Sequence, residues 1–194
     1  MQTLKELYKV GPGPSSSHTL APARACRLYL ENYPDTATVD VHLYGSLSLT
    51  GKGHFTDKII QDTFAPRPCE VHFKLDWEQP FPNGFTIDGY DEKGELTGHW
   101  SVYSLGGGSI FIVERPDIII QQPYKEKTMS EIIEVCKTNH WNFADYVFNN
   151  EDEGLVDYLN QILSAMLASV QRGLNASGVL PSKLGIERSA KSMY

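Results

Sequence analysis

The order of apolar and polar residues predicts a helix and then a strand near the start of the chain. Leu20 to Asn32 repeats apolar side chains at helical spacing, and Pro34 soon afterwards marks the end of this helix. Pro22 fits the prediction because the missing N–H of a proline costs nothing in a first helical turn. Thr38 to Tyr44 then alternates apolar and polar residues, which is the period of a strand.

The following residues predict a sheet with further helices. We expect the Gly-rich stretch 45–54 to be a loop and residues 57–64 to form a second helix. Alternating or apolar runs then predict strands, the second and third joined as a hairpin, over 70–77, 85–90, 96–105 and 110–113. This order indicates an α+β fold, with a helix, a strand, a helix and three or four further strands in a mixed sheet covered by helices.

The last third of the chain predicts helices only. Helical spacing marks residues 130–137 and, with a longer apolar stripe, residues 154–174. We therefore expect a first domain over residues 1–117, a boundary between 117 and 150, and a C-terminal helical extension over 150–194. One long helix cannot bury a core of its own, so the extension needs the first domain, a partner chain or further sequence.

Composition and charge narrow the classes of partner. Hydrophobic residues make up 41% and charged residues 21%, which is ordinary for a globular protein. The net charge of −7 argues against binding to nucleic acid, and no apolar run is long enough to cross a bilayer. Since residues 1–7 contain no apolar signal core, we expect a cytoplasmic protein whose partners include neither nucleic acid nor a membrane.

The first candidate site is the run Ser15-Ser16-Ser17-His18-Thr19, which follows two Gly-Pro pairs and precedes the first predicted helix. A helix start offers unpaired N–H groups and partial positive charge, which suit a carboxylate or a phosphate. His18 lies among these donors and could move a proton near neutral pH. The alternative is an ordinary helix cap, because Ser and Thr are the residues that most often cap helices.

Glycine clusters mark two further loops, around 45–53 and 106–108, and neither has the spacing of a nucleotide-binding loop. His54 follows Gly53 just before the second predicted helix, so it parallels His18, although alone it would be an ordinary polar residue flanking a helix. We expect the segments 15–19, 52–56 and 106–109 to converge on one face, because each joins a glycine cluster to an apolar element.

Four ordered motifs resemble the bacterial iron–sulfur L-serine dehydratases. They match the N-terminal β domain of that family in order and spacing, and they span 13–19, 50–58, 82–84 and 103–108. Residues 169–174 and 178–184 resemble the opening of the catalytic α domain of the family. The β domain of the family is itself similar to the allosteric substrate-binding domain of some phosphoglycerate dehydrogenases, a compact α+β unit.

The resemblance implies a lyase that converts L-serine to pyruvate and ammonia by β-elimination without pyridoxal phosphate. A four-iron four-sulfur (4Fe-4S) cluster would act as the Lewis acid, with a missing α domain or α subunit as a partner and a homo-oligomer as the assembly. His18 and His54 would be the catalytic residues, with either as the base. The substrate-binding residues would be Ser15, Ser16, Ser17, Thr19, Asn83, Gly106, Gly107 and Gly108.

The chain departs from the family pattern at several positions. Phe81 stands where a histidine is usual, and Phe55 stands where a glycine is common. The ligating cysteines of the family lie in the α domain beyond Tyr194, and Cys26, Cys69 and Cys136 are not at their positions. We therefore expect this chain alone to bind no cluster and to be inactive. The alternative function is a non-catalytic module that binds a carboxylate or mediates dimerisation.

Overall fold

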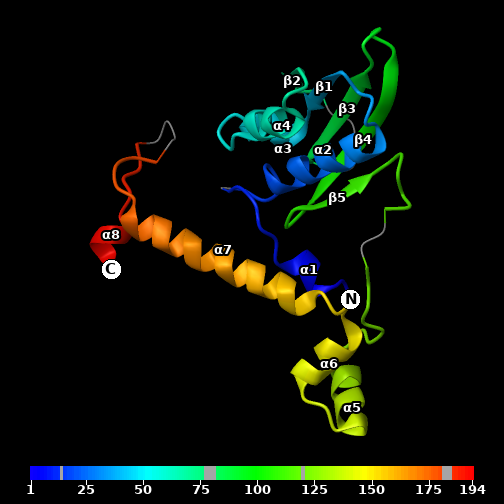
Figure 1. Ribbon diagram of the computed structural model, residues 1–194, viewed down its shortest axis with the longest axis vertical. Coiled ribbons are helices and arrows are strands. Elements are labelled where there is room, and N and C mark those ends of the chain that lie inside the picture. Colours follow the sequence, from blue (N-terminus) through cyan, green and yellow to red (C-terminus); the bar gives the residue numbers. More distant parts are fainter. Residues whose placement is uncertain (14, 77–81, 119–120, 181–184) are drawn as a thin grey trace. The chain divides into compact units, whose positions relative to one another are not determined.

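The computed structural model describes residues 1–13, 15–76, 82–118, 121–180 and 185–194 (Figure 1). The chain divides into two compact units, one formed by Gly11–Ile119 and the other by Met1–Val10 together with Ile120–Tyr194. The first ten residues therefore belong with the C-terminal part of the chain. That the two units correspond to a β domain and the opening of an α domain stays a prediction.

The unit Gly11–Ile119 is built on one five-stranded sheet. Its strands are β1 (Thr38–Leu43), β2 (Cys69–Phe73), β3 (Gly84–Tyr90), β4 (Leu96–Gly106) and β5 (Ser109–Ile112). They lie in the order β2-β1-β3-β4-β5, with β1 and β2 parallel and the other neighbours antiparallel. The prediction of an α+β fold with a mixed sheet and a C-terminal helical extension is confirmed.

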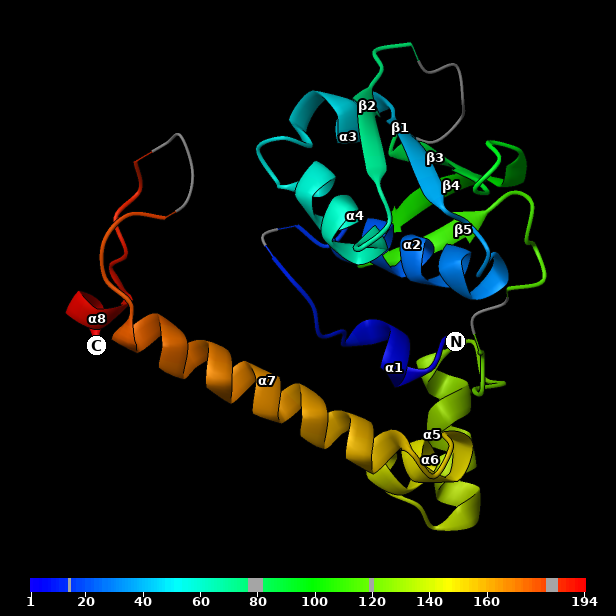
Figure 2. The ribbon, with the colours of Figure 1, turned by 45° about the horizontal axis from the view of Figure 1, so that its top comes forward.

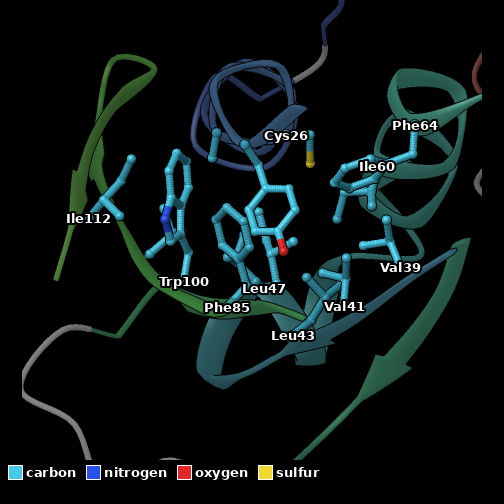
Figure 3. Close-up of a cluster of buried hydrophobic side chains, with 14 residues drawn as sticks. Cys26, Val39, Val41, Leu43, Leu47, Ile60, Phe64, Phe85, Trp100 and Ile112 are labelled. Atoms are coloured by element: carbon cyan, nitrogen blue, oxygen red, sulfur yellow. The ribbon is translucent and has the colours of Figure 1, made fainter. Parts of the chain in front are cut away.

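Helices α2 (Leu20–Asn32) and α4 (Thr56–Phe64) cover one face of this sheet (Figure 2). Side chains from both helices meet those of the strands in a single core (Figure 3). Alternation along each strand supplies this core, because every second side chain points to the same face. The largest fully buried side chains are Trp100, Tyr29, Phe64, Phe85, Leu43, Leu47, Ile60 and Ile87.

The Gly-rich stretch 45–54 is not wholly a loop, because helix α3 (Gly45–Thr50) forms in it. Its start depends on glycine: Gly45 has φ +52°, and a Cβ there would lie 2.1 Å from the carbonyl oxygen of Pro82. Leu47 is fully buried in the core and anchors the helix. The helix has only six residues, which is too few for a helical period of apolar residues to be recognised in the sequence. Trp77, placed in a predicted strand, lies outside the described residues.

The second unit consists of helices, two of which enclose a small core. They are α1 (Leu4–Leu7), α5 (Met129–Asn139), α6 (Phe143–Asn150), α7 (Leu155–Asn175) and α8 (Ala190–Met193). Capping boxes begin α5 and α6, and the core between these helices consists of Tyr124, Cys136 and Tyr146. Sequence periodicity indicated α5 and α7, whereas α1, α6 and α8 are too short to show it.

Glu151 holds the N-terminal residues in this unit through hydrogen bonds. Its carboxylate accepts hydrogen bonds from the hydroxyl of Thr3 at 2.5 Å, from the amide of Leu4 at 2.8 Å and from the hydroxyl of Tyr124 at 2.6 Å. These three donors satisfy a partly buried charge, as a buried carboxylate requires. The first residues are therefore held by contacts with residues more than a hundred positions later in the sequence.

Helix α7 exposes an apolar stripe. Leu163, Met166, Leu167 and Val170 follow helical spacing, and between 53% and 62% of each is exposed. A stripe of this kind is usually covered by another helix. Among the described residues, no helix combines the length and the apolar character that crossing a membrane requires.

Replacing Ile87 by Ala tests the sheet core. Ile87 is fully buried and lies opposite Val41 and Trp100 at the centre of the sheet. We expect Ile87→Ala to lower the free energy of unfolding by about 2–5 kcal/mol in a urea titration, because it leaves a cavity. Leu96→Ala, at a position that is 58% exposed, serves as the control and should change stability by no more than about 0.5 kcal/mol. Equal losses for both would contradict this core.

Candidate functional site

Three of the sequence motifs meet at one end of the sheet. Leu43 lies opposite Phe85, and Gly84 lies opposite Tyr103, so the end of β1, the start of β3 and the end of β4 are at the same edge. The amide of Ser46 in α3 donates to the carbonyl of Pro82 at 2.9 Å, and the amide of Ser104 donates to the carbonyl of Asn83 at 2.9 Å. The Pro-Asn-Gly segment therefore lies between α3 and β4.

His18 connects the remaining motif, residues 13–19, to α3. Its Nε2 is 2.8 Å from the hydroxyl of Thr50 and 3.4 Å from the carbonyl of Ser46. The Thr50 hydroxyl already donates to the Ser46 carbonyl at 2.8 Å, so it accepts from His18, and the proton of the neutral ring lies on Nε2. The residue is only 7% exposed. His18 is thus a buried, hydrogen-bonded residue and not an exposed loop residue.

The other ring nitrogen of His18 faces the serine run. Nδ1 lies 3.1 Å from the Ser17 hydroxyl and 3.2 Å from the Ser15 hydroxyl, either of which can donate to it. Thr19 is fully buried and donates to the carbonyls of Pro12 and Ser15 at 2.6 and 2.7 Å. These hydroxyls shape the loop and orient His18. Within the described residues, Ser16 makes no side-chain hydrogen bond. A substrate-binding role for the run stays a prediction.

His54 lies beside His18, with ring centroids 4.5 Å apart and planes 33° from parallel. Its Nδ1 is 3.0 Å from the carbonyl of Thr50, which can only accept, so the neutral ring carries its proton on Nδ1. Nε2 then keeps a lone pair and has no hydrogen bond to any residue that the structure describes. The structure thus brings together the two histidines that the sequence singled out, and it leaves a basic nitrogen on His54.

The surroundings of His18 favour its neutral form. Burial lowers the pKa of His18 below the usual 6.5, the hydrogen bond to the Ser46 carbonyl opposes this change, and nearby His54 adds to it. A positive charge on His18 would be poorly solvated and would repel a positive charge on His54. His18 is therefore neutral at pH 7.

In the described part of the chain, the buried side-chain polar atoms without partners belong to Ser48, Thr56, Asn83, Ser104 and, in the core, Trp100. Within the described residues, no partner reaches the hydroxyl of Ser48 in α3, the side-chain carbonyl of Asn83 or the hydroxyl of Ser104 in β4. An unpaired buried polar group costs about 1–3 kcal/mol, so such groups usually meet water or a ligand. Sequence reasoning selected Asn83 but missed the two serines, because a lone serine in a strand or short helix carries no signal of its own.

The glycines at 106–108 have a structural explanation. All three have positive φ, between +58° and +101°, and Gly107 and Gly108 form the turn from β4 to β5. The turn lies at the same end of the sheet as Asn83, because β4 ends there. A binding role for Gly106, Gly107 and Gly108 stays a prediction. Phe81, where the family usually has a histidine, lies outside the described residues.

The three cysteines do not fit an iron–sulfur cluster. A four-iron cluster is usually held by four thiolates. Cys26 is fully buried in the sheet core, and burial raises the pKa of its thiol well above the usual value. Burial also raises the pKa of Cys69 to about 12, and Cys136 belongs to the other unit. Because Cys26 is enclosed in the sheet core, at most two of the three thiols remain accessible, which is too few to hold such a cluster.

Comparison with known proteins agrees with these motifs. Residues 3–70 match the sequence profile of the serine dehydratase beta chain. This segment includes His18, α3 and His54. This segment therefore resembles the serine dehydratase beta chain.

Full-length relatives extend the similarity over the whole chain. The L-serine dehydratase of Haemophilus influenzae is 28% identical over 247 aligned positions, which cover 100% of this chain and 54% of the relative. L-serine dehydratase 1 of Escherichia coli is 29% identical over 246 positions, with the same coverage. The L-serine dehydratase of Streptomyces coelicolor is 27% identical and covers 95% of this chain. The resemblance to L-serine dehydratases is confirmed.

The match to these relatives is partial in two ways. The chain spans about half the length of the curated relatives it matches, in their N-terminal half. The alignments are also longer than the 194 residues of the chain, so the relatives carry residues within the aligned region that this chain lacks. The chain described here is therefore shorter than the region of the relatives that it matches.

The buried His18 predicts a loss of stability at acidic pH. Because its pKa is lower in the folded than in the unfolded chain, the unfolded chain binds more protons once the pH falls below about 6.5. We expect the free energy of unfolding to fall from pH 7 to pH 5, and to fall less steeply in His18→Gln. Urea titrations at several pH values measure both slopes. Identical slopes would contradict a neutral His18.

The backbone conformation at Phe55 predicts that glycine is more stable than alanine at this position. Phe55 has φ +60° and ψ +31°, the left-handed conformation that costs a residue with a side chain roughly 1–2 kcal/mol. We expect Phe55→Gly to be more stable than Phe55→Ala by about 1 kcal/mol in thermal unfolding. At Leu75, which is exposed and has no positive φ, glycine should instead be less stable than alanine. The same sign at both positions would refute the strain.

Proposed function

We propose that this chain supplies the histidine-containing part of an L-serine dehydratase, which converts L-serine to pyruvate and ammonia by β-elimination. The observation that carries the proposal is the His18–His54 pair, held at 4.5 Å by α3. The similarity of the whole chain to L-serine dehydratases supports the choice of substrate. Neither observation would be expected of a helix cap alone.

His54 is the residue that transfers the proton in this proposal. Its Nδ1–H is fixed by the Thr50 carbonyl, so Nε2 is the basic nitrogen and has a defined orientation. A base must reach the proton that it removes, and His54 is less buried than His18. His54 Nε2 takes the α-proton of L-serine, the electron pair forms the Cα–Cβ double bond, and hydroxide leaves Cβ. The aminoacrylate becomes an imine, which water hydrolyses to pyruvate and ammonia.

His18 is a positioning residue in this proposal. Both of its ring nitrogens are engaged, by serine hydroxyls on one side and by Thr50 on the other. Neither nitrogen is therefore free to take a proton directly from a substrate. Its contact with the ring of His54 instead restricts how that ring can turn. The sequence assigned proton transfer to either histidine, and the geometry favours His54.

The unpaired buried atoms suit the polar groups of L-serine. The Asn83 carbonyl can only accept, which suits an ammonium or hydroxyl donor. The hydroxyls of Ser48 and Ser104 can donate to a carboxylate, and Ser16 lies in the loop next to His18. We assign substrate binding to these four residues.

The rest of the enzyme would provide what this chain lacks. The iron–sulfur cluster of the complete enzyme would take its cysteines from another part of the assembly, since the thiols of Cys26, Cys69 and Cys136 do not fit one. The apolar stripe of α7 supports a helical partner, either an α domain or an α subunit. Assembly as a homo-oligomer stays a prediction.

The unpaired atoms at Asn83, Ser48 and Ser104 also favour the second candidate function, a carboxylate-binding module without chemistry. Both functions require the same binding residues, and they differ only in what His54 does. Turnover therefore separates them, whereas binding of L-serine does not.

The test joins this chain to the C-terminal half that its relatives carry and measures pyruvate formed from L-serine. We expect His54→Asn, whose amide can replace the Nδ1–H bond, to lower kcat by about 10²–10⁴ with little change in Tm. His18→Gln, whose amide can replace the Nε2–H bond, should lower Tm and reduce kcat much less. His140→Asn, an exposed histidine of the other unit, serves as the matched control and should change neither.

Three results would count against the proposal. Near-normal kcat in a folded His54→Asn variant would exclude His54 as the base and leave the binding module. Pyruvate production by the 194-residue chain alone would show that the cluster and the second half are unnecessary. Binding of L-serine without turnover by the joined, cluster-loaded protein would favour the module.

A further inference from the structure

The sheet face opposite the helices carries two transverse rows of polar side chains. In one row Glu70, Asp40, Asp88 and His99 lie opposite one another across β2, β1, β3 and β4. In the next row His72 and His42 lie opposite each other, followed by Thr86 and Ser101. The core occupies the other face because side chains alternate along each strand. The candidate active site uses none of these residues.

Three carboxylates occupy consecutive positions of the first row. Like charges directly opposite each other destabilise a sheet, so each needs a compensating positive charge. Asp88 lies 2.6 Å from His99 Nδ1 and 3.8 Å from His42 Nδ1, and Glu70 lies 3.7 Å from His72 Nε2. Asp40, between the other two carboxylates, makes no ion pair with any residue that the structure describes. The middle of the row therefore lacks a cation.

The atoms around this position form a ligand set. One oxygen from Asp40, one from Glu70 and one ring nitrogen from His72 lie within 4.8 Å of one another. Zinc bonds to oxygen and nitrogen ligands at roughly 2.0–2.2 Å, so in a tetrahedral site such atoms lie roughly 3.3–3.6 Å apart and the three must move closer together. Glu70 is exposed and His72 partly exposed, so small side-chain rotations suffice.

We propose that Asp40, Glu70 and His72 bind a divalent transition-metal ion of the Zn²⁺ class. The ion neutralises the facing carboxylates of β1 and β2 and joins the edge strand β2 to its neighbour. An imidazole ligand favours a transition metal over Mg²⁺ or Ca²⁺, which prefer oxygen ligands alone. His42 stacks on His72 with centroids 4.7 Å apart, which holds the ring in place. Three protein ligands leave a position for water.

This site is tested by isothermal titration calorimetry, in which Zn²⁺ alone is titrated into the 194-residue chain. Thiols also bind Zn²⁺, so the measurement is made in a Cys69→Ala background, which removes the thiol nearest to the site along β2. We expect one equivalent to bind, and His72→Gln and Asp40→Asn each to weaken binding at least about tenfold. His99→Gln, which changes a histidine of the same face outside the ligand set, is the matched control and should retain the affinity.

The outcomes are decisive in either direction. Binding that survives Cys69→Ala and is lost in both ligand variants, but not in His99→Gln, supports the site. No binding at millimolar Zn²⁺, binding lost on Cys69→Ala, or equal losses in all three histidine and aspartate variants would overturn it. Circular dichroism checks that each variant is folded, and Glu70→Gln replaces any variant that is not.

Discussion

Thr50 is the residue on which the arrangement of the candidate site depends. Its hydroxyl accepts from Nε2 of His18, and its backbone carbonyl accepts from Nδ1 of His54. One residue therefore sets the tautomer of both rings, and it does so at the last position of a six-residue helix. That helix begins at a glycine that no other residue could replace without a clash against Pro82. The chemistry proposed for His54 thus depends on the backbone conformation of Gly45, nine residues earlier.

The sheet could be predicted from the sequence because apolar and polar residues alternate along its strands. Alternation placed β1, β3 and β4 within one or two residues of their observed ends, and α2 was predicted with its observed bounds. Local periodicity suffices where one face of an element is buried. It failed for α3, where six residues are too few to show a period and where the decisive contact, with Pro82, comes from a distant part of the chain.

The candidate site was predicted in part, for a related reason. Residue type and glycine context selected His18, His54 and Asn83, which the structure places within linked segments of one sheet end. The tautomers, the burial of His18 and the unpaired hydroxyls of Ser48 and Ser104 could not be predicted, since each depends on tertiary contacts. The polar rows on the open sheet face were also hidden in the sequence, because they appear only when the register of four strands is known.

The tie between the first residues and Glu151 has a consequence for how the protein is made. The sheet unit lies between two parts of the helical unit along the chain, so it is in effect an insertion within that unit. A ribosome delivers residues in order, and domains generally fold as units during synthesis. The sheet unit can fold as soon as residue 119 has emerged. The N-terminal segment cannot form its hydrogen bonds until Glu151 has been synthesised. Until then it lacks its partners in the helical unit, while the sheet unit that follows it can already be folded.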